Sequence, residues 1–365
     1  MSRVVVKIGT SSITDDEGVV NRGTIAKLCR EVAALRASGS DVVIVTSGAI
    51  AAGLPELGLG GANRPSDAVT LQAVATVGQL ALMEVYRAEL ASHGLVSGQV
   101  LLTPHDFIVR AQYLHARQTL TCLLELGVVP VVNENDAIAD DEIRWGDNDR
   151  IAALVANLVD ADRLVLLTDT EGVLTGDPRV EHAASLIEVI HEIDSQTEAM
   201  AGGAGTVRGS GGMASKLAAA KIASWSGVDT VIANAAREDV VADAVAGAPG
   251  VGTTVRSRET RIAARKLWIA FAVVAQGRVV VDTGARRALE TGKSLLAAGV
   301  RSVDGEFDPG SPVEVVDTEG SVFAKGLARH GSAEIGRVAG RRSDVLPAGS
   351  PAVVIHADDL VTIPA

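Results

Sequence analysis

Short apolar runs recur along the first part of the chain and predict the strands of a sheet. Each run has 4–6 residues, is rich in Val and Ile, and ends near Gly, Asn, Ser or Thr. The runs cover residues 3–8, 41–46, 128–132, 163–168 and 230–233. Uninterrupted apolar runs of this length are typical of strands that are buried on both faces, as in parallel sheets.

Longer segments with helical periodicity separate these runs. Within residues 23–37, Ile25, Leu28, Val32 and Leu35 fall on one face of a helix. Helical patterns also cover residues 65–92, 110–126, 149–160 and 213–226. Strands that alternate with helices predict an open, mainly parallel α/β sheet covered by helices on both faces. Ligands of such sheets bind at the carboxyl ends of the strands.

The pattern changes near residue 260. Residues 259–270 have the pattern of a charged helix. Val-rich runs broken by Gly, Pro and Asp follow at residues 278–282, 312–316, 321–327 and 351–355, which predicts a small, mostly β module. We therefore expect a catalytic domain over residues 1–258, a linker helix over 259–274 and a β domain over 275–365.

Composition and charge exclude several classes of protein. The chain is 47% hydrophobic and 21% charged, which excludes intrinsic disorder. The net charge of −12 provides no global basic field for nucleic acid, so an anion must be bound by a few placed cations and backbone N–H groups. The longest stretches without charged residues, 68–83 and 90–105, contain Gln, Thr or Ser and fall short of a membrane span.

The N-terminus and the cysteines indicate a cytoplasmic protein. The first residues contain no signal-peptide core, and Cys29 and Cys122 make no disulfide framework. Each cysteine lies in an apolar helical pattern and is expected to be buried. The seven histidines have no metal-ligand spacing, so a zinc site is not expected.

Lys7 and the small residues after the second apolar run are candidate anion ligands. Lys7 lies inside the first run, just before Gly9, and a cation in a central strand is costly unless it meets an anion. The alternative is a lysine that extends to solvent from an edge strand. Ser47 and Gly48 lead into a helix, whose N-terminus favours an anion, although the same sequence fits an ordinary strand–helix turn.

Acidic and amide residues follow the run at 128–132. Asp136 suits an ammonium group, and Asn148 offers an amide for donor and acceptor contacts with a polar substrate. The alternative is a solvated acidic loop. A calcium loop is not expected, because its characteristic spacing is absent.

Two further segments suit a nucleotide. Thr168 and Asp169 end the run at 163–168, where they suit a nucleotide contact or an ordinary helix cap. A glycine-rich segment then leads into a helix with Lys216 in its first turn, and free N–H groups, a positive helix end and a mobile cation suit phosphate. It is not a Walker A loop, because Lys216 follows Ser and precedes Leu.

In this order and spacing, the segments resemble the amino acid kinase family. The matching segments are residues 6–11, 46–53, 133–136, 146–149, 167–169 and 211–216. Residues 265–270 and 282–285 resemble the PUA domain that many bacterial enzymes of this type carry. The sequence departs from the usual pattern at Ser210, where Thr is usual, at Gly176, where Ala is common, and at Ala357, where Arg is often present.

The resemblance implies a reaction and its residues. ATP, with Mg²⁺, would phosphorylate the side-chain carboxylate of L-glutamate, which is the first step of L-proline biosynthesis. The implied catalytic residues are Lys7 and Lys216, on opposite sides of the transferred group, and Asp149, which holds both lysines. Implied substrate residues are Ser47, Gly48, Asp136 and Asn148. Implied nucleotide residues are Lys7, Gly9, Thr168, Asp169, Ser210, Gly211, Gly212, Met213 and Lys216. No protein metal ligand is expected, because ATP phosphates and water would hold Mg²⁺.

The resemblance also implies inhibition by proline near Asp136 and Asn148, and a homodimer or homotetramer. Three alternatives stay open. One is a kinase of the same fold acting on carbamate, aspartate, acetylglutamate or a nucleoside monophosphate. Another is an RNA-binding protein, which the few aromatics and the net charge of +1 over residues 261–365 (13 Lys and Arg against 12 Asp and Glu) disfavour. The third, a nicotinamide oxidoreductase, would need a glycine fingerprint directly after the first strand.

Overall fold

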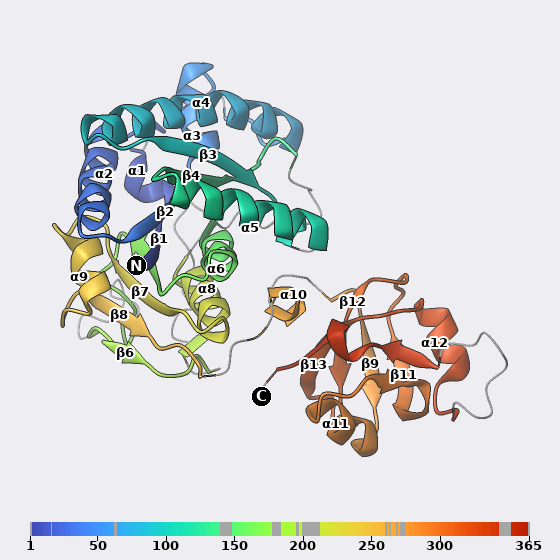
Figure 1. Cartoon of the computed structure of the whole chain (residues 1–365). Coiled ribbons are helices and arrows are strands. Elements are labelled where there is room, and N and C mark those ends of the chain that lie inside the picture. Colours follow the sequence, from blue (N-terminus) through green and yellow to red (C-terminus); the bar gives the residue numbers. More distant parts are fainter. Residues whose placement is uncertain are drawn as a thin grey trace. The chain divides into compact units, whose positions relative to one another are not determined.

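The chain forms two compact units, Met1–Arg261 and Ile262–Ala365 (Figure 1). The structure is a computed structural model of all 365 residues. It describes residues 2–15, 17–61, 64–107, 109–138, 148–176, 184–194, 197–198, 212–259, 262, 264–267, 269–270, 275–342 and 352–363.

The described part of unit 1 is built on an eight-stranded sheet. Its strands are β1 (Arg3–Ile8), β2 (Asp41–Val45), β3 (Ser97–Leu102), β4 (Val129–Glu134), β5 (Arg163–Thr168), β6 (Val189–Ile190), β7 (Asp229–Asn234) and β8 (Gly252–Val255). They lie in the order β3-β4-β2-β1-β5-β7-β8-β6. All neighbours are parallel except β7 and β8, which are antiparallel. Strand β1 therefore lies inside the sheet, between β2 and β5.

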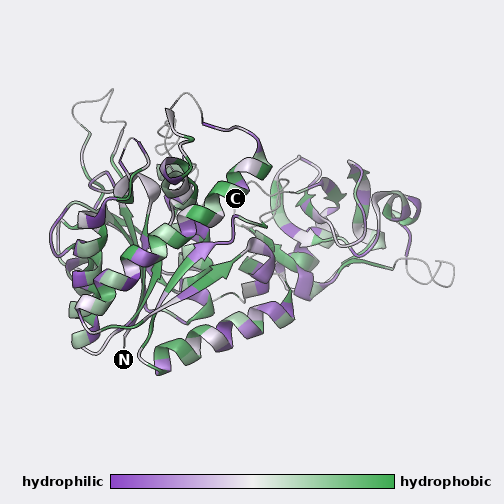
Figure 2. Cartoon of the chain, turned by 90° about the horizontal axis from the view of Figure 1, so that it is seen from above, coloured by the Kyte–Doolittle hydropathy of each residue, from purple (hydrophilic) through white to green (hydrophobic). Residues whose placement is uncertain are grey.

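Helices cover both faces of this sheet. One apolar core joins Val4, Val6 and Ile8 of β1 to α2 (Arg22–Ala37), α3 (Ala49–Glu56), α4 (Ala68–Ser92) and α9 (Val240–Ala246). Side chains alternate across a strand, so Val5 and Lys7 point to the other face. There α6 (Asn148–Leu158) packs against β1, α5 (Arg110–Glu125) and α8 (Met213–Trp225). Figure 2 shows mainly hydrophobic strands between helices that are hydrophobic on one side and hydrophilic on the other.

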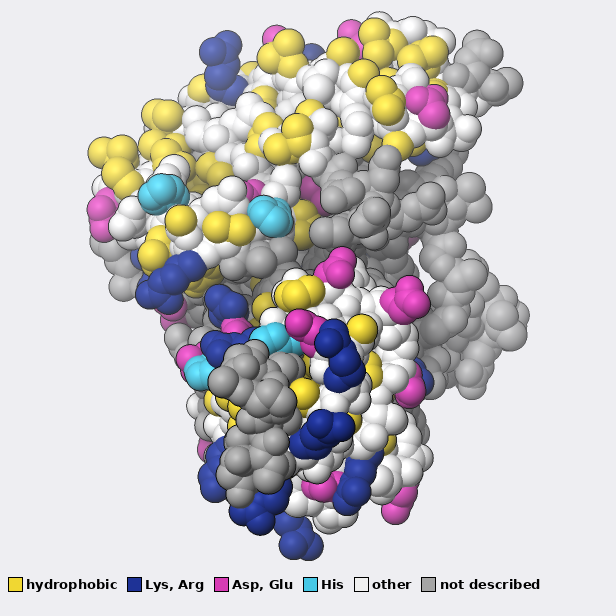
Figure 3. Space-filling model, turned by 90° about the vertical axis from the view of Figure 1, so that its right-hand side faces the viewer, with side chains coloured by type: hydrophobic (Ala, Val, Ile, Leu, Met, Phe, Trp, Pro, Cys, Tyr) yellow, Lys and Arg dark blue, Asp and Glu magenta, His cyan; other side chains and the backbone are white. Residues whose placement is uncertain are grey.

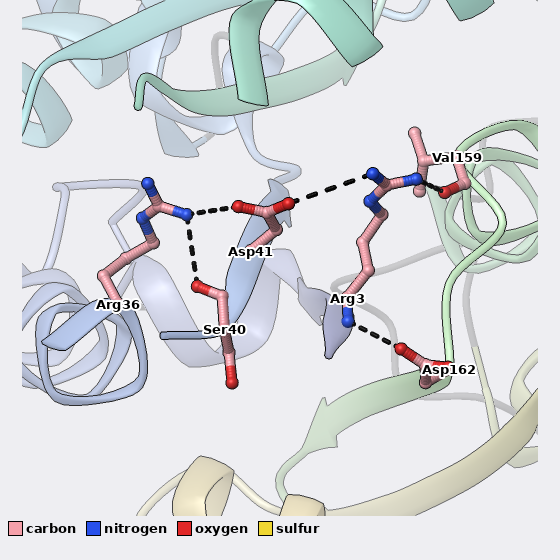
Figure 4. A network of polar contacts seen from close by, with 6 residues as sticks. All are labelled: Arg3, Arg36, Ser40, Asp41, Val159 and Asp162. Carbon is pink, nitrogen blue, oxygen red and sulfur yellow. Dashed lines mark hydrogen bonds and ion pairs between the residues drawn. The ribbon is translucent and has the colours of Figure 1, made fainter. Parts of the chain in front are cut away.

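Polar contacts tie the amino ends of β1 and β2 to their surroundings (Figure 4). Asp41 forms ion pairs with Arg36 at 2.5 Å and with Arg3 at 3.9 Å. Arg36 also donates to the carbonyl oxygen of Ser40 at 3.2 Å, and the backbone N–H of Arg3 donates to Asp162 at 2.7 Å. These ion pairs and hydrogen bonds stabilise the end of the sheet that lies opposite the carboxyl ends of the strands.

Unit 2 has its own sheet and core. Its strands are β9 (Gly277–Val281), β10 (Leu295–Leu296), β11 (Val300–Asp304), β12 (Pro312–Val316), β13 (Val322–Leu327), β14 (Val353–Ile355) and β15 (Leu360–Thr362). Five of them form a sheet in the order β11-β9-β12-β13-β15, and β10 pairs with β14. The described helices are α10 (Ala264–Leu267), α11 (Thr283–Glu290) and α12 (Ser332–Val338). Val279, Val313 and Ile355 are fully buried in the core of this unit.

The expected α/β class, with a mainly parallel sheet, helices on both faces and a small β-rich C-terminal part, is confirmed. The predicted domain limits and the linker helix over 259–274 stay predictions. Within residues 259–270 the described helix is the short α10. The prediction that both cysteines are buried is wrong for Cys122, which is exposed on α5, and correct for Cys29. Burial raises the pKa of Cys29 to about 12.

Among the described helices, α4 is long and apolar enough to cross a membrane by length and composition alone. The uncharged stretch 68–83 had been expected to fall short of a span, but the helix continues to Ser92. Leu82, Tyr86 and Leu90 of α4 are buried in the core beside the sheet. A core helix of a globular domain passes the same test of length and composition.

Candidate active site

The carboxyl ends of four neighbouring strands bring most of the predicted residues together. The strands β4, β2, β1 and β5 are adjacent and parallel, so their carboxyl ends lie along one edge of the sheet. Lys7 is near the end of β1, Ser47 follows β2, Asn133 is near the end of β4 and Thr168 ends β5. The topology therefore predicts a single site along this edge.

Lys7 lies in the interior of the sheet and is not an edge-strand residue. It is only 4% exposed, so the alternative of a lysine that extends to solvent is wrong. Its Nζ lies 2.6 Å from Oδ1 of Asp149, in the first turn of α6. A Cβ on Gly9 would lie 3.5 Å from this ammonium, so glycine leaves space beside it.

Asp149 also binds Lys216, which is remote in sequence. Its Oδ2 lies 3.2 Å from Nζ of Lys216 and accepts a 3.0 Å hydrogen bond from the hydroxyl of Ser215, both in the first turn of α8. Helices α6 and α8 pack together, and this packing brings the two turns into contact. The structure thus brings Lys7, Asp149 and Lys216 into one buried cluster.

The charge balance of this cluster keeps Asp149 ionised. Asp149 is 0% exposed, and burial by itself would raise the pKa of its carboxyl group. The ammonium groups of Lys7 and Lys216 outweigh this effect and lower the pKa of Asp149 to about 2. One carboxylate against two ammonium groups leaves a net positive charge in the cluster. That excess suits a phosphoryl group, whose charge must be neutralised during transfer.

The predicted substrate residues surround the end of β4 and the start of α3. Ser47 is buried, and Gly48 caps α3 with a φ of +92°, a left-handed conformation that favours glycine. Oδ1 of Asn148 accepts a 3.1 Å hydrogen bond from the backbone N–H of Glu134. Burial raises the pKa of Asp136 to about 6. A carboxylate that is poorly solvated before a ligand arrives is well suited to pair with an ammonium group.

The predicted nucleotide residues lie beside β5 and α8. Thr168 is buried and donates a 3.1 Å hydrogen bond to the carboxylate of Asp169, which is exposed. Gly212 is the N-cap of α8 and Met213 is its first residue, so both lie at the helix end whose first backbone N–H groups have no acceptor within the helix. The predictions for Ser210 and Gly211 fall outside the described residues.

Three residues near the site were not predicted. Ser215 supports Asp149, and Gln79 of α4 accepts a 2.7 Å hydrogen bond from Asn133. Tyr86 of α4 shares a 2.9 Å hydrogen bond with the hydroxyl of Thr46. Polar residues on the buried face of an otherwise apolar helix are a sequence signal that could have identified Gln79 and Tyr86.

A protein-held metal centre has no support in the described part of the chain, where no group of three or more His, Cys, Asp and Glu residues could hold an ion.

The comparison with family models defines the class of protein. The model of the amino acid kinase family matches residues 2–234, and that of the PUA domain matches residues 277–348. The chain belongs to the amino acid kinase family.

Individual relatives indicate which member of this family the chain resembles. The chain is 46% identical to the glutamate 5-kinase of Ralstonia nicotianae, over 99% of this chain and 97% of that protein. It is 44% identical to the glutamate 5-kinase of Pelobacter propionicus, over 100% of this chain and 98% of that protein. A solved isopentenyl phosphate kinase is 20% identical, with a TM-score of 0.48, and the match covers 69% of this chain and 99% of that one.

Proposed function

We propose that this protein transfers the γ-phosphoryl group of Mg·ATP to the side-chain carboxylate of L-glutamate, as the glutamate 5-kinases that it resembles are named for doing. The observation that carries the proposal is the buried pairing of Lys7 and Lys216 with one carboxylate, Asp149. The full-length identity of 44–46% to glutamate 5-kinases supports the choice of acceptor.

The chemistry needs positioning and charge neutralisation more than acid–base catalysis. A glutamate side chain, with a pKa near ~4.3, is already a carboxylate at neutral pH. One of its oxygens attacks the γ-phosphorus, the bond from that phosphorus to the bridging oxygen of ADP breaks, and L-glutamyl 5-phosphate and ADP leave. Lys7 and Lys216 neutralise the charge on the transferred group, and Asp149 keeps both ammonium groups oriented.

The remaining residues divide between the two substrates. Ser47, Gly48, Asp136 and Asn148 bind glutamate, with Asp136 at the α-ammonium group. Backbone N–H groups at Gly9 and at the start of α8, together with Thr168 and Asp169, bind the nucleotide. The product enters L-proline synthesis in the cytoplasm, and proline competes with glutamate near Asp136 and Asn148. If millimolar proline leaves the glutamate KM unchanged, the proposed competition between proline and glutamate is wrong.

The working unit is a homo-oligomer, either a dimer or a tetramer. Apolar side chains are exposed on and beside the edge strand β3 and on the helices next to it, and Figure 3 shows hydrophobic side chains over this side of unit 1. They include Leu80 (65% exposed), Val96 (65%), Leu114 (39%) and Leu126 (71%). A second copy of the chain would bury them. Light scattering during gel filtration should give at least twice the monomer mass, and a monomer at micromolar concentration would oppose this point.

A hydroxamate assay tests the proposed reaction. ATP, Mg²⁺, glutamate and hydroxylamine should yield glutamyl hydroxamate and ADP in equal amounts. Carbamate, aspartate, acetylglutamate and a nucleoside monophosphate serve as competing acceptors, with ADP formation as the common readout. ADP release that is faster with any of these than with glutamate would overturn the choice of acceptor. Salt-sensitive, sub-micromolar RNA binding without kinase activity would favour an RNA-binding protein.

A further inference from the structure

The backbones of helices α3 and α4 are in direct contact beside the residues that are proposed to bind glutamate. A Cβ on Gly78 of α4 would lie 1.8 Å from the carbonyl oxygen of Ala49, the first residue of α3. A Cβ on Gly53 of α3 would lie 2.2 Å from the carbonyl oxygen of Val74. Only glycine fits at either position. Gln79 directly follows Gly78 in α4. The close contact therefore holds the turn of α4 that contains Gln79 against the start of α3.

The side chain of Gln79 points into the protein and meets the end of β4. Gln79 is only 9% exposed, and its Oε1 accepts a 2.7 Å hydrogen bond from Nδ2 of the fully buried Asn133. Oδ1 of Asn133 accepts from the backbone N–H of Glu134 at 2.9 Å. The same N–H donates to Oδ1 of Asn148 at 3.1 Å. A continuous series of hydrogen bonds thus runs from α4 to Asn148.

The backbone determines how both amide groups are oriented. The N–H of Glu134 can only donate, so the Asn133 atom that it meets must be the oxygen. The NH₂ group of Asn133 then faces Gln79 and requires its oxygen. Nε2 of Gln79 is consequently left buried, with no hydrogen-bond partner in the part of the chain that the structure describes. Each such donor is unfavourable for stability, and a native protein rarely keeps one without a reason.

We propose that Gln79 is a positioning residue of the amino-acid pocket. Through Asn133 it holds the N–H of Glu134 between two amide oxygens, and so fixes the orientation of Asn148. A residue that is present although it lowers the stability of the folded protein is typical of a functional site. This inference rests on the proposed function and deepens it, because Asn148 is one of the proposed glutamate ligands. No described hydrogen bond joins Gln79 to the lysines or to Asp149, so its loss should affect amino-acid binding and spare phosphoryl transfer.

The direct test is Gln79→Met, which keeps the length of the side chain and removes both amide atoms. We expect the glutamate KM and the glutamate Kd from calorimetry to rise about ten- to hundredfold, as for residues that orient metal ligands. The kcat and the KM for ATP should stay within about threefold of the wild-type values. The Tm should change little, because the substitution removes the unpaired Nε2 of Gln79 but leaves Nδ2 of Asn133 without its acceptor. A purely structural role would change the stability alone and leave the glutamate KM and Kd unchanged.

A double-variant cycle tests whether Gln79 acts through Asn133. Gln79→Met combined with Asn133→Ala should bind glutamate no more weakly than Asn133→Ala alone. Glu31→Gln is the matched control, since Glu31 is 2% exposed and accepts from the N–H of Val241, away from this series of hydrogen bonds. We expect it to lower stability and leave the glutamate KM unchanged.

The outcomes separate this inference from the proposed function. Hydroxamate formation by the wild-type protein tests the reaction by itself, and the comparison of variants with wild type tests Gln79. A folded Gln79→Met with an unchanged glutamate KM and Kd would overturn the inference, as would effects that multiply in the double variant. Gln79→Leu replaces Gln79→Met if the latter does not fold. If neither folds, Gln79 is a structural residue and the inference is wrong.

Discussion

Replacing Asp149 with Asn removes the carboxylate that two buried ammonium groups share. Lys7 is 4% and Lys216 is 5% exposed, so neither can turn to bulk water without a change in packing. Removing one partner of a buried ion pair typically costs about 3–5 kcal/mol of unfolding free energy. Here one change leaves two ammonium groups uncompensated, so we expect the upper part of that range.

The same change should impair catalysis more than it impairs binding. Without the carboxylate, each lysine loses its orienting partner, and the kcat should fall by roughly 10²–10³-fold, as for other preorganised charge-stabilising groups. Urea unfolding and initial rates measure the two effects separately.

The matched control is Asp41→Asn at the opposite end of the sheet. Asp41 also pairs with two cationic side chains, Arg3 and Arg36, but its side chain is 17% exposed and lies away from the carboxyl ends of the strands. Its loss should cost at most about 1–2 kcal/mol and leave the kcat unchanged. The reasoning about Asp149 is refuted if Asp149→Asn is as stable and as active as this control.

Two further changes probe the pocket proposed for glutamate. Asp136, whose pKa is raised to about 6 by burial, is ionised above that pH and neutral below it. Because only the carboxylate attracts an ammonium group, kcat/KM for glutamate should fall by about tenfold per pH unit below 6, and Asp136→Asn should lose both this dependence and most of the affinity. Gly48→Ala forces a side chain into a φ of +92°, with its Cβ 3.4 Å from Cδ1 of Ile13. We expect it to cost about 1–2 kcal/mol in chemical denaturation and to raise the glutamate KM, and wild-type stability would contradict this assignment.

The sequence predicted the interior of the sheet better than its edges. Interior strands such as β1 and β5 are buried on both faces, so their apolar runs are unbroken and visible. The edge strand β3 has Ser, Gly and Gln among its residues and is mostly half-buried or exposed, so it lacks that signal. The antiparallel β8 contains two Thr residues and was missed for a similar reason.

The site could be predicted in part because its motifs follow the strands directly. Lys7, Ser47 and Thr168 follow from the rule that ligands bind at carboxyl ends of parallel strands. The pairing of Lys7 and Lys216 through Asp149 came only from resemblance, since no local pattern relates residues so remote in sequence. Gln79 was missed because its role depends on a contact between α4 and β4 that only the folded chain creates.

The central claim is that the side-chain carboxylate of glutamate attacks the γ-phosphorus of ATP at the Lys7–Asp149–Lys216 cluster. Glutamate labelled with a heavy oxygen isotope in that carboxylate tests it directly, with hydroxylamine present to trap the product. Attack by the carboxylate leaves one labelled oxygen bridging carbon and phosphorus, and hydroxylamine then displaces phosphate that carries it. The account predicts singly labelled phosphate in amounts equal to the hydroxamate formed. Unlabelled phosphate, released at the same rate with or without glutamate, would contradict it.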